Sequence, residues 1–269
     1  MIKTKISENI NKIKNNNIDI KEARSKDTVL WPSFDDVIGA PGNRVLLAGN
    51  MQAGWFGEVP ASEFITGDEL ARMVGISAGV SQNSNEPWLK FAYEGSVLLV
   101  SKKPIRYSIA WNEINEANCV YGDRVVEITN KKYKVMLMRG VGADVQPDPK
   151  VNTKQPEHYI GKDCQNSMWN KLILPLHVNA PNKWQIPANV DSPTEDWKVG
   201  YTDEDLGTTN RNGIKGAYTL CQDYLGVEAR YGFHECAARA LKSVEYFEEM
   251  PHSNSLDYAG WRPCLKLIG

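Results

Sequence analysis

The sequence lacks the features that would assign it to a nucleic-acid-binding or membrane-spanning class. Its 31 lysines and arginines are balanced by 33 acidic residues, which leaves a net charge of −2 and no basic excess of the kind that nucleic acid attracts. No apolar run approaches the roughly 18 residues that a membrane-spanning helix needs. The first residues show no apolar core of a signal peptide. We therefore expect neither a nucleic acid nor a membrane as a partner.

Closely spaced cysteines are also lacking. The five cysteines lie at least 15 residues apart and form no CxxC pair, so the spacing of a structural zinc site is missing. An odd number in a chain of 269 residues does not favour a disulfide scaffold. We interpret them as reduced, small core residues and expect no metal ion or other cofactor.

The N-terminal segment, residues 1–30, contains neither an aromatic residue nor a glycine. Its isoleucines have the spacing of one helical face. They are Ile2, Ile6, Ile10 and Ile13. A single helix this short is marginal in water, so the stripe needs a partner. We expect an arm that docks on a neighbouring subunit or another protein; packing on its own domain and a disordered tail are the alternatives.

Two larger parts follow, residues 31–145 and residues 146–269, divided by a stretch rich in glycine, proline and charge. The clearest helix signal lies in the first part, where Thr66 and Glu69 have the spacing of a capping box. Gly75 is a suitable end for this helix. Its predicted buried face consists of Leu70, Met73 and Val74.

Strand patterns surround this helix. Residues 45–48 predict a short strand, and two hairpins are predicted from β-forming runs on either side of a polar turn. The hairpins join residues 88–93 to 97–100 and residues 125–128 to 133–138. A short helix is expected between them, ending near Ala117.

The second part is expected to be richer in loops. A helix is predicted over residues 165–174, with Trp169, Leu172 and Ile173 inward and Pro175 as its end. The stretch 178–216 reads as loop because of its prolines and its acidic run.

The end of the chain has no polar tail. Its last ten residues place Trp261, Cys264 and Leu267 between Arg262 and Lys266, in a strand pattern. Chain ends fray unless something holds them, so we expect this end to be paired within a sheet. Together these elements predict an α+β fold of mixed antiparallel sheets with short helices, long loops and an N-terminal helical arm.

Seven short motifs follow one another along residues 55–269. They are residues 57–67, 88–91, 102–106 and 133–135, the pair Trp169-Asn170, Arg239, and Gly260-Trp261-Arg262-Pro263. Their order resembles that of a family of bacteriophage virion structural proteins. The resemblance implies a non-enzymatic component of the virion, in the tail, baseplate, collar or surface decoration, that is assembled in the host cytoplasm. Its partners would be other virion proteins and further copies of itself.

The second part also resembles the C-type-lectin-like and sulfatase-modifying-factor-like modules of phage adhesins, which are loop-rich α+β folds with both ends in one sheet. This resemblance implies an alternative function, a carbohydrate-binding module that recognises a host-surface glycan. Trp184 and Trp197 lie in loops where sugar-stacking rings would be expected. The reactive cysteine pair of the sulfatase-modifying enzymes has no counterpart here, so no catalysis is carried over.

Two local clusters contain residue types that carry chemistry. Asp203 and Asp205, with Asn210 nearby, bring together oxygen ligands that calcium prefers. They lack the spacing of an EF-hand, and we interpret them as a solvated acidic turn that is a candidate binding segment. His234 and Cys236 would share one face of a strand, as a base and a nucleophile must. A glycan hydrolase built on this pair is the third hypothesis; we interpret the pair as an edge histidine beside a buried cysteine and expect no catalytic residue.

Overall fold

The computed structural model describes residues 39–141, 167–179, 195–227 and 234–268, together with the backbone of a short ribbon near the N-terminus. This ribbon pairs β1 (Arg24–Ser25) antiparallel to β2 (Thr28–Val29). Two predictions lie outside the described residues. They are the isoleucine stripe of Ile2, Ile6, Ile10 and Ile13 and the ring of Trp184.

The larger sheet of the described part has seven strands in the order β3-β4-β6-β7-β15-β10-β9. Every neighbouring pair in it is antiparallel. Its strands are β3 (Ala48–Gly49), β4 (Ala53–Val59), β6 (Trp88–Tyr93), β7 (Ser96–Ser101), β15 (Cys264–Leu267), β10 (Lys131–Met136) and β9 (Tyr121–Ile128). The mixed α+β class with mostly antiparallel sheets is therefore confirmed.

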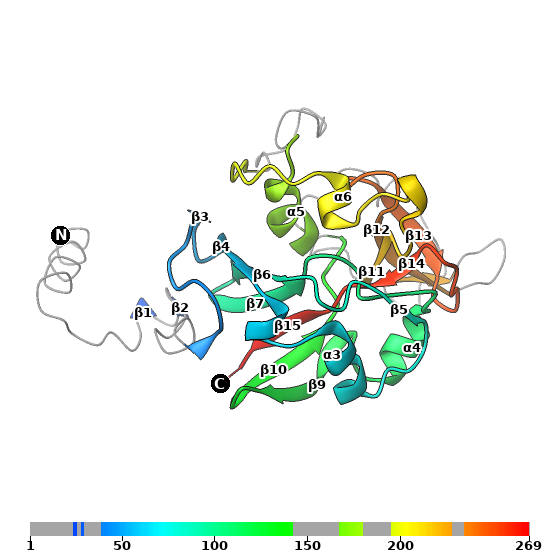
Figure 1. Ribbon diagram of the computed structural model, residues 1–269, viewed down its shortest axis with the longest axis horizontal. Coiled ribbons are helices and arrows are strands. Elements are labelled where there is room, and N and C mark those ends of the chain that lie inside the picture. Colours follow the sequence, from blue (N-terminus) through cyan, green and yellow to red (C-terminus); the bar gives the residue numbers. More distant parts are fainter. Residues whose placement is uncertain are drawn as a thin grey trace, which may run out of the picture.

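Both faces of this sheet are buried. Successive side chains of a strand point to opposite faces, and on β7 Leu99 belongs to one hydrophobic cluster while Leu98 and Val100 belong to another. The first cluster includes residues of α3 (Gly67–Val74) and α4 (Trp111–Glu116). The second includes residues of α5 (Met168–Leu172) and Leu206 of α6 (Asp203–Leu206). Figure 1 shows these two helix pairs on opposite sides of the sheet.

The C-terminal strand lies inside this sheet. Leu265 of β15 stands opposite Leu99 on one side and Val135 on the other. Figure 1 shows β15, in red, running between β7 and β10. The prediction that the chain end pairs within a sheet is therefore confirmed.

The smaller sheet of the described part has six strands in the order β13-β12-β11-β14-β8-β5. They are β13 (Phe247–Pro251), β12 (His234–Ala240), β11 (Tyr218–Val227), β14 (Ala259–Trp261), β8 (Arg106–Tyr107) and β5 (Val80–Ser81). β14 pairs parallel with β11 and antiparallel with β8. Each sheet thus draws strands from both sides of the predicted boundary at residue 145, which does not separate two sheets.

Gly260 is required by this parallel pairing. A Cβ atom added at Gly260 would lie 2.0 Å from the carbonyl oxygen of Gly216. Only a residue without a side chain allows the two backbones to approach so closely.

The strongest local predictions are confirmed. The Oγ1 of Thr66 accepts from the Glu69 amide and the Glu69 carboxylate accepts from the Thr66 amide, and Gly75 ends α3 with a φ of 82°. The hairpins β6–β7 and β9–β10 also form, and α4 ends at Glu116 with Ala117 as its C-cap. In the first hairpin the turn residues Glu94 and Gly95 both have positive φ, as a two-residue turn that matches strand twist requires.

Four local predictions need correction. Met73 is 42% exposed, because the buried stripe of α3 follows Leu70, Ala71 and Val74 at helical spacing. Of the strand predicted over residues 45–48, only Ala48 lies in a strand, as the first residue of β3. Pro175 does not end the helical path, since it lies within the 3₁₀ turn η3 (Leu174–Leu176).

The fourth correction concerns the stretch 178–216, whose described residues include α6 and the 3₁₀ turn η4 (Arg211–Gly213). A further 3₁₀ turn, η1 (Ala61–Glu63), precedes α3. No helix in the described ranges is long and apolar enough to cross a bilayer.

Lys90 holds the segment through which the chain enters the larger sheet. Its side chain is fully buried, and its Nζ donates to the carbonyls of Asn43 at 2.7 Å and Ala40 at 3.4 Å. The ammonium also lies 5.1 Å from the centre of the Phe56 ring. Burial, with a smaller contribution from Arg44, lowers the pKa of Lys90 to about 8.

The lowered pKa of Lys90 predicts a pH-dependent stability. Between about pH 8 and the ordinary lysine value near 10.5, the unfolded chain holds a proton that the folded chain has released, so this group makes stability rise with pH. We expect Lys90→Met to remove that contribution, and Lys198→Met, at an exposed position, to keep it. Urea unfolding at several pH values measures the difference, and equal slopes in wild type and Lys90→Met would contradict this account.

The central position of β15 predicts a large effect of truncating one side chain. Leu265→Ala removes buried atoms from a strand that is covered on both faces, and we expect the free energy of unfolding to fall by about 2–5 kcal/mol. Ile268→Ala, just beyond the strand and exposed, should change it by no more than about 0.5 kcal/mol. Urea denaturation of both variants tests this, and similar losses would show that β15 is not a core strand.

Candidate functional site

Three motifs that stand far apart in the sequence meet at the ring of Trp169. This ring is fully buried, and its Nε1 donates to the carbonyl of Val244 at 2.8 Å. The guanidinium carbon of Arg262 lies 5.4 Å from the ring centre, and that of Arg239 lies 5.8 Å from it. Both arginines are buried. One aromatic ring therefore stabilises two buried cations through its π-face; we call this the Trp169 cluster.

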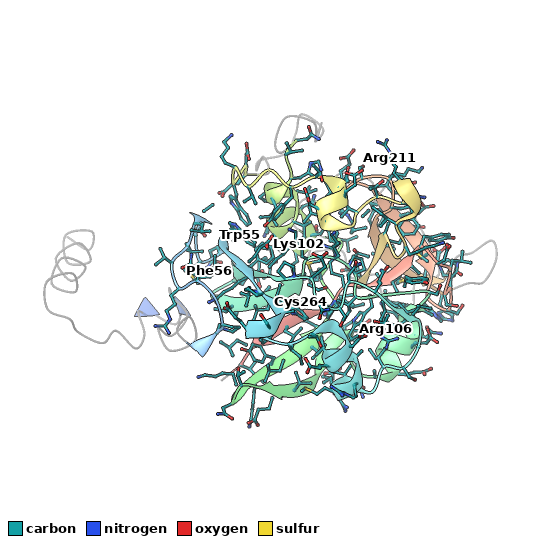
Figure 2. All side chains as sticks on the ribbon, in the orientation of Figure 1. Trp55, Phe56, Lys102, Arg106, Arg211 and Cys264 are labelled. Atoms are coloured by element: carbon teal, nitrogen blue, oxygen red, sulfur yellow. The ribbon has the colours of Figure 1, made fainter. Side chains whose placement is uncertain are left out.

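Arg262 connects the end of the chain to two distant segments. Its guanidinium donates to the carbonyl of Lys102 at 2.8 Å and to the carbonyl of Leu206 in α6. Figure 2 labels Lys102 near the middle of the view, above Cys264 on β15. Burial lowers the pKa of Arg262 to about 9. The backbone carbonyls and the Trp169 ring offset the cost of burying this charge.

Arg239 makes a second set of connections. Its guanidinium donates to the carbonyl of Gly140 at 3.0 Å, to Oδ1 of Asn170 at 2.8 Å and to the carbonyl of Glu245 at 3.3 Å. A Cβ at Gly140 would lie 2.7 Å from Cys221 Sγ, so the close approach of Gly140 to Cys221 requires glycine. The Trp169 cluster thus joins α5 to β12 and to the chain beyond β10.

A second cluster, of aromatic and imidazole rings that extend from the core to the surface, was not predicted from the sequence. Its centre is Trp111 at the start of α4, and its other members are Tyr121, Tyr224, His234 and His252. Trp111 is buried, and its Nε1 donates to the carbonyl of Cys221 at 2.9 Å. Tyr121 is 50% exposed and His234 is exposed. We call this group the ring cluster; only His234 had been singled out from the sequence.

The two histidines of the ring cluster face each other at one end of the β12–β13 pair, His234 as the first residue of β12 and His252 as the residue after β13. Their ring centres are 5.1 Å apart with planes tilted by 38°. The hydroxyl of Tyr224 is hydrogen-bonded to Nδ1 of His234. Nδ1 of His252 is buried and has no hydrogen-bond partner. Burial, and secondarily the neighbouring His234, lowers the pKa of His252.

The structure does not support Trp197 as a sugar-stacking ring. The side chain is 7% exposed, packs against Phe91 at 6.2 Å between ring centres, and donates from Nε1 to Glu195 at 3.0 Å. Its ring face is therefore covered by the second core cluster. The predicted exposure of Trp197 is wrong, because an aromatic residue in a proline-rich loop can still pack on a sheet.

The predicted acidic segment caps a helix. Asp205 forms a capping box with Thr202, whose amide and hydroxyl it accepts from at 2.9 and 2.7 Å. Asp203 accepts from the amide of Val244 at 2.7 Å and from the hydroxyl of Thr208 at 2.8 Å. The spacing of Thr202 and Asp205 is a helix-start signal that sequence reasoning missed. In the described part of the chain, no group of three or more metal-ligating side chains is placed to hold an ion.

His234 and Cys236 do not form a nucleophile and base pair. Cys236 is fully buried in the core and burial raises the pKa of its thiol, which keeps the thiolate, the reactive form, unpopulated. His234 is exposed and engaged with Tyr224. The interpretation of a buried cysteine is confirmed, but His234 is the exposed first residue of β12, which lies between β13 and β11 and is not an edge strand. Burial likewise raises the pKa of Cys119 and Cys264 to about 12.

Two surface grooves border α3. One, of 390 Å³, is lined by Gly75, Glu113, Glu116 and Arg124 among others. The other, of 470 Å³, lies by Arg72 and Met73. Neither groove contains a residue that was predicted to bind a ligand.

The Trp169 cluster predicts that Arg262 is essential to stability. Arg262→Met leaves the carbonyls of Lys102 and Leu206 without their charged donor, and we expect the free energy of unfolding to fall by at least about 3 kcal/mol. Arg211→Met, at the exposed position labelled in Figure 2, should change it by no more than about 0.5 kcal/mol. Chemical denaturation compares the two, and an equally mild effect at Arg262 would refute the assigned role.

Comparison of the chain with protein-family models, with curated proteins and with solved structures finds no match. The two clusters are therefore interpreted from their own geometry.

Proposed function

We propose that this chain is a non-enzymatic structural component of a bacteriophage particle, in its tail, baseplate, collar or surface decoration, which assembles through protein–protein interfaces. The observation that carries the proposal is the meeting of Trp169-Asn170, Arg239 and Arg262 in one buried cluster. These residues belong to separate motifs of the phage resemblance. Three of the motifs that carry the resemblance are therefore in contact with one another in the fold, which supports reading them together.

An exposed apolar patch supports the assembly part of the proposal. Val45 and Leu47 are 69% and 61% exposed, whereas Leu46 between them packs against the small cluster around Phe56. The patch lies beside β3, at an edge of the larger sheet. Exposed apolar side chains that adjoin one another are typical of interaction surfaces.

The N-terminal arm is the second element of the proposed assembly. Its isoleucine stripe needs an apolar partner. The body exposes Val45 and Leu47 shortly after Asn43, whose carbonyl accepts from Lys90. The arm would act as the anchor, either on a second copy or on another virion protein. The patch of Val45 and Leu47 would form part of the same interface. The location in the virion follows from the same resemblance.

The proposal predicts that removal of residues 1–30 changes the assembly and not the fold. Light scattering should give a multimer for the full chain and a smaller species for the truncated one, with the same circular dichroism spectrum and without incorporation into particles. Val45→Ser combined with Leu47→Ser should weaken the multimer, and Leu256→Ser, at an exposed apolar site elsewhere, should not.

Normal incorporation of the truncated chain into particles would count against the assembly proposal. A monomer in both forms would direct attention to the carbohydrate-binding alternative. That alternative rests on the lectin-like resemblance, and the burial of Trp197 removes one of its two predicted rings.

A further inference from the structure

His234 begins β12 and His252 directly follows the end of β13, at facing positions. Glu235 of β12 stands opposite Pro251 of β13, so one step further along the pair His234 faces His252. The amide of His252 donates to the carbonyl of His234 at 2.9 Å, which continues the strand pairing to these residues. Facing side chains of an antiparallel pair project from the same face of the sheet, and the two imidazoles are held side by side by the backbone.

The separation of the two rings suits a shared metal ion. Two imidazoles that bind one ion at the usual metal–nitrogen distance of about 2.0–2.1 Å and a near-tetrahedral angle have ring centres about 5 Å apart. The observed separation is 5.1 Å. A bound ion would therefore need little movement of either backbone.

The hydrogen bonding of the pair also fits a metal site. Histidine ligands are normally oriented by a hydrogen bond from the ring nitrogen that does not bind the metal, and the Tyr224 hydroxyl occupies Nδ1 of His234 in this way. Nδ1 of His252 is buried without a hydrogen-bond partner, which is unusual for a buried polar atom and is accounted for when an ion is taken up beside it.

We propose that His234 and His252 form a two-histidine binding site for a divalent transition-metal ion such as Zn²⁺, Ni²⁺ or Cu²⁺. Imidazole nitrogen suits these ions better than Ca²⁺ or Mg²⁺, which prefer oxygen. Water completes the coordination shell on the exposed side of His234. The ion links the start of β12 to the end of β13 and so stabilises the edge of the smaller sheet.

Metal titration of the full-length protein tests the site. After treatment with a chelator, isothermal titration with Zn²⁺ should show one ion bound through this pair, and the melting temperature should rise with added Zn²⁺. His234→Gln and His252→Gln should each weaken binding by at least about tenfold, and Tyr224→Phe should weaken it less. His158→Gln is the matched control and should bind as wild type does. His234 is exposed, so His234→Gln keeps the test valid if His252→Gln fails to fold.

Cobalt distinguishes this pair from a cysteine site. Co²⁺ bound to the two imidazoles gives visible d–d bands without the near-ultraviolet sulfur-to-metal charge-transfer band, and His234→Gln should abolish them. Unchanged Zn²⁺ affinity in both histidine variants, a thiolate spectrum, or no binding at millimolar Zn²⁺ would each overturn the proposal.

Discussion

The segment from β14 to β15 is the constraint on which the rest of the structure depends. Within a few residues the chain pairs with β11 and β8 in the smaller sheet and then with β7 and β10 in the larger one. Arg262 stands at the crossing, buried against Trp169 and bonded to the carbonyls of Lys102 and Leu206. A buried guanidinium is costly unless its partners are in place, so this junction is stable only when both sheets and their covering helices are assembled.

The residues that determine the packing of this protein and the residues suited to recognition lie in different places, the first in the interior and the second at the surface. The motifs behind the phage resemblance supply buried residues such as Trp88, Tyr133 and Trp169, and they specify the packing of the sheets. Features with the chemistry of recognition lie elsewhere, at the apolar patch of Val45 and Leu47 and at the ring cluster. A fold can serve many functions, and function resides in such surfaces. The assembly proposal and the metal proposal therefore rest on different residues.

The ring cluster shows why sequence spacing is a poor guide to sites built on sheets. His234 and His252 are separated by a strand, a turn and another strand, with no spacing that marks a metal motif. Their juxtaposition comes from the register of β12 and β13. Trp111 and Tyr121 join from α4 and β9, elements that no local pattern connects to either histidine.

Local chemistry in the sequence determined the elements that close over a few residues. Three features could be predicted: the capping box of Thr66 and Glu69, the two hairpins and the pairing of the apolar chain end. The partners in the capping box and the hairpins lie close in sequence, and an apolar chain end is stable only when it is buried. The order of the strands, the burial of Trp197, Lys90 and Arg262, and the pairing of the histidines were decided by the tertiary structure. Each depends on contacts between residues far apart in the chain, and hydrophobic patterns along one segment do not specify which distant segment will cover it.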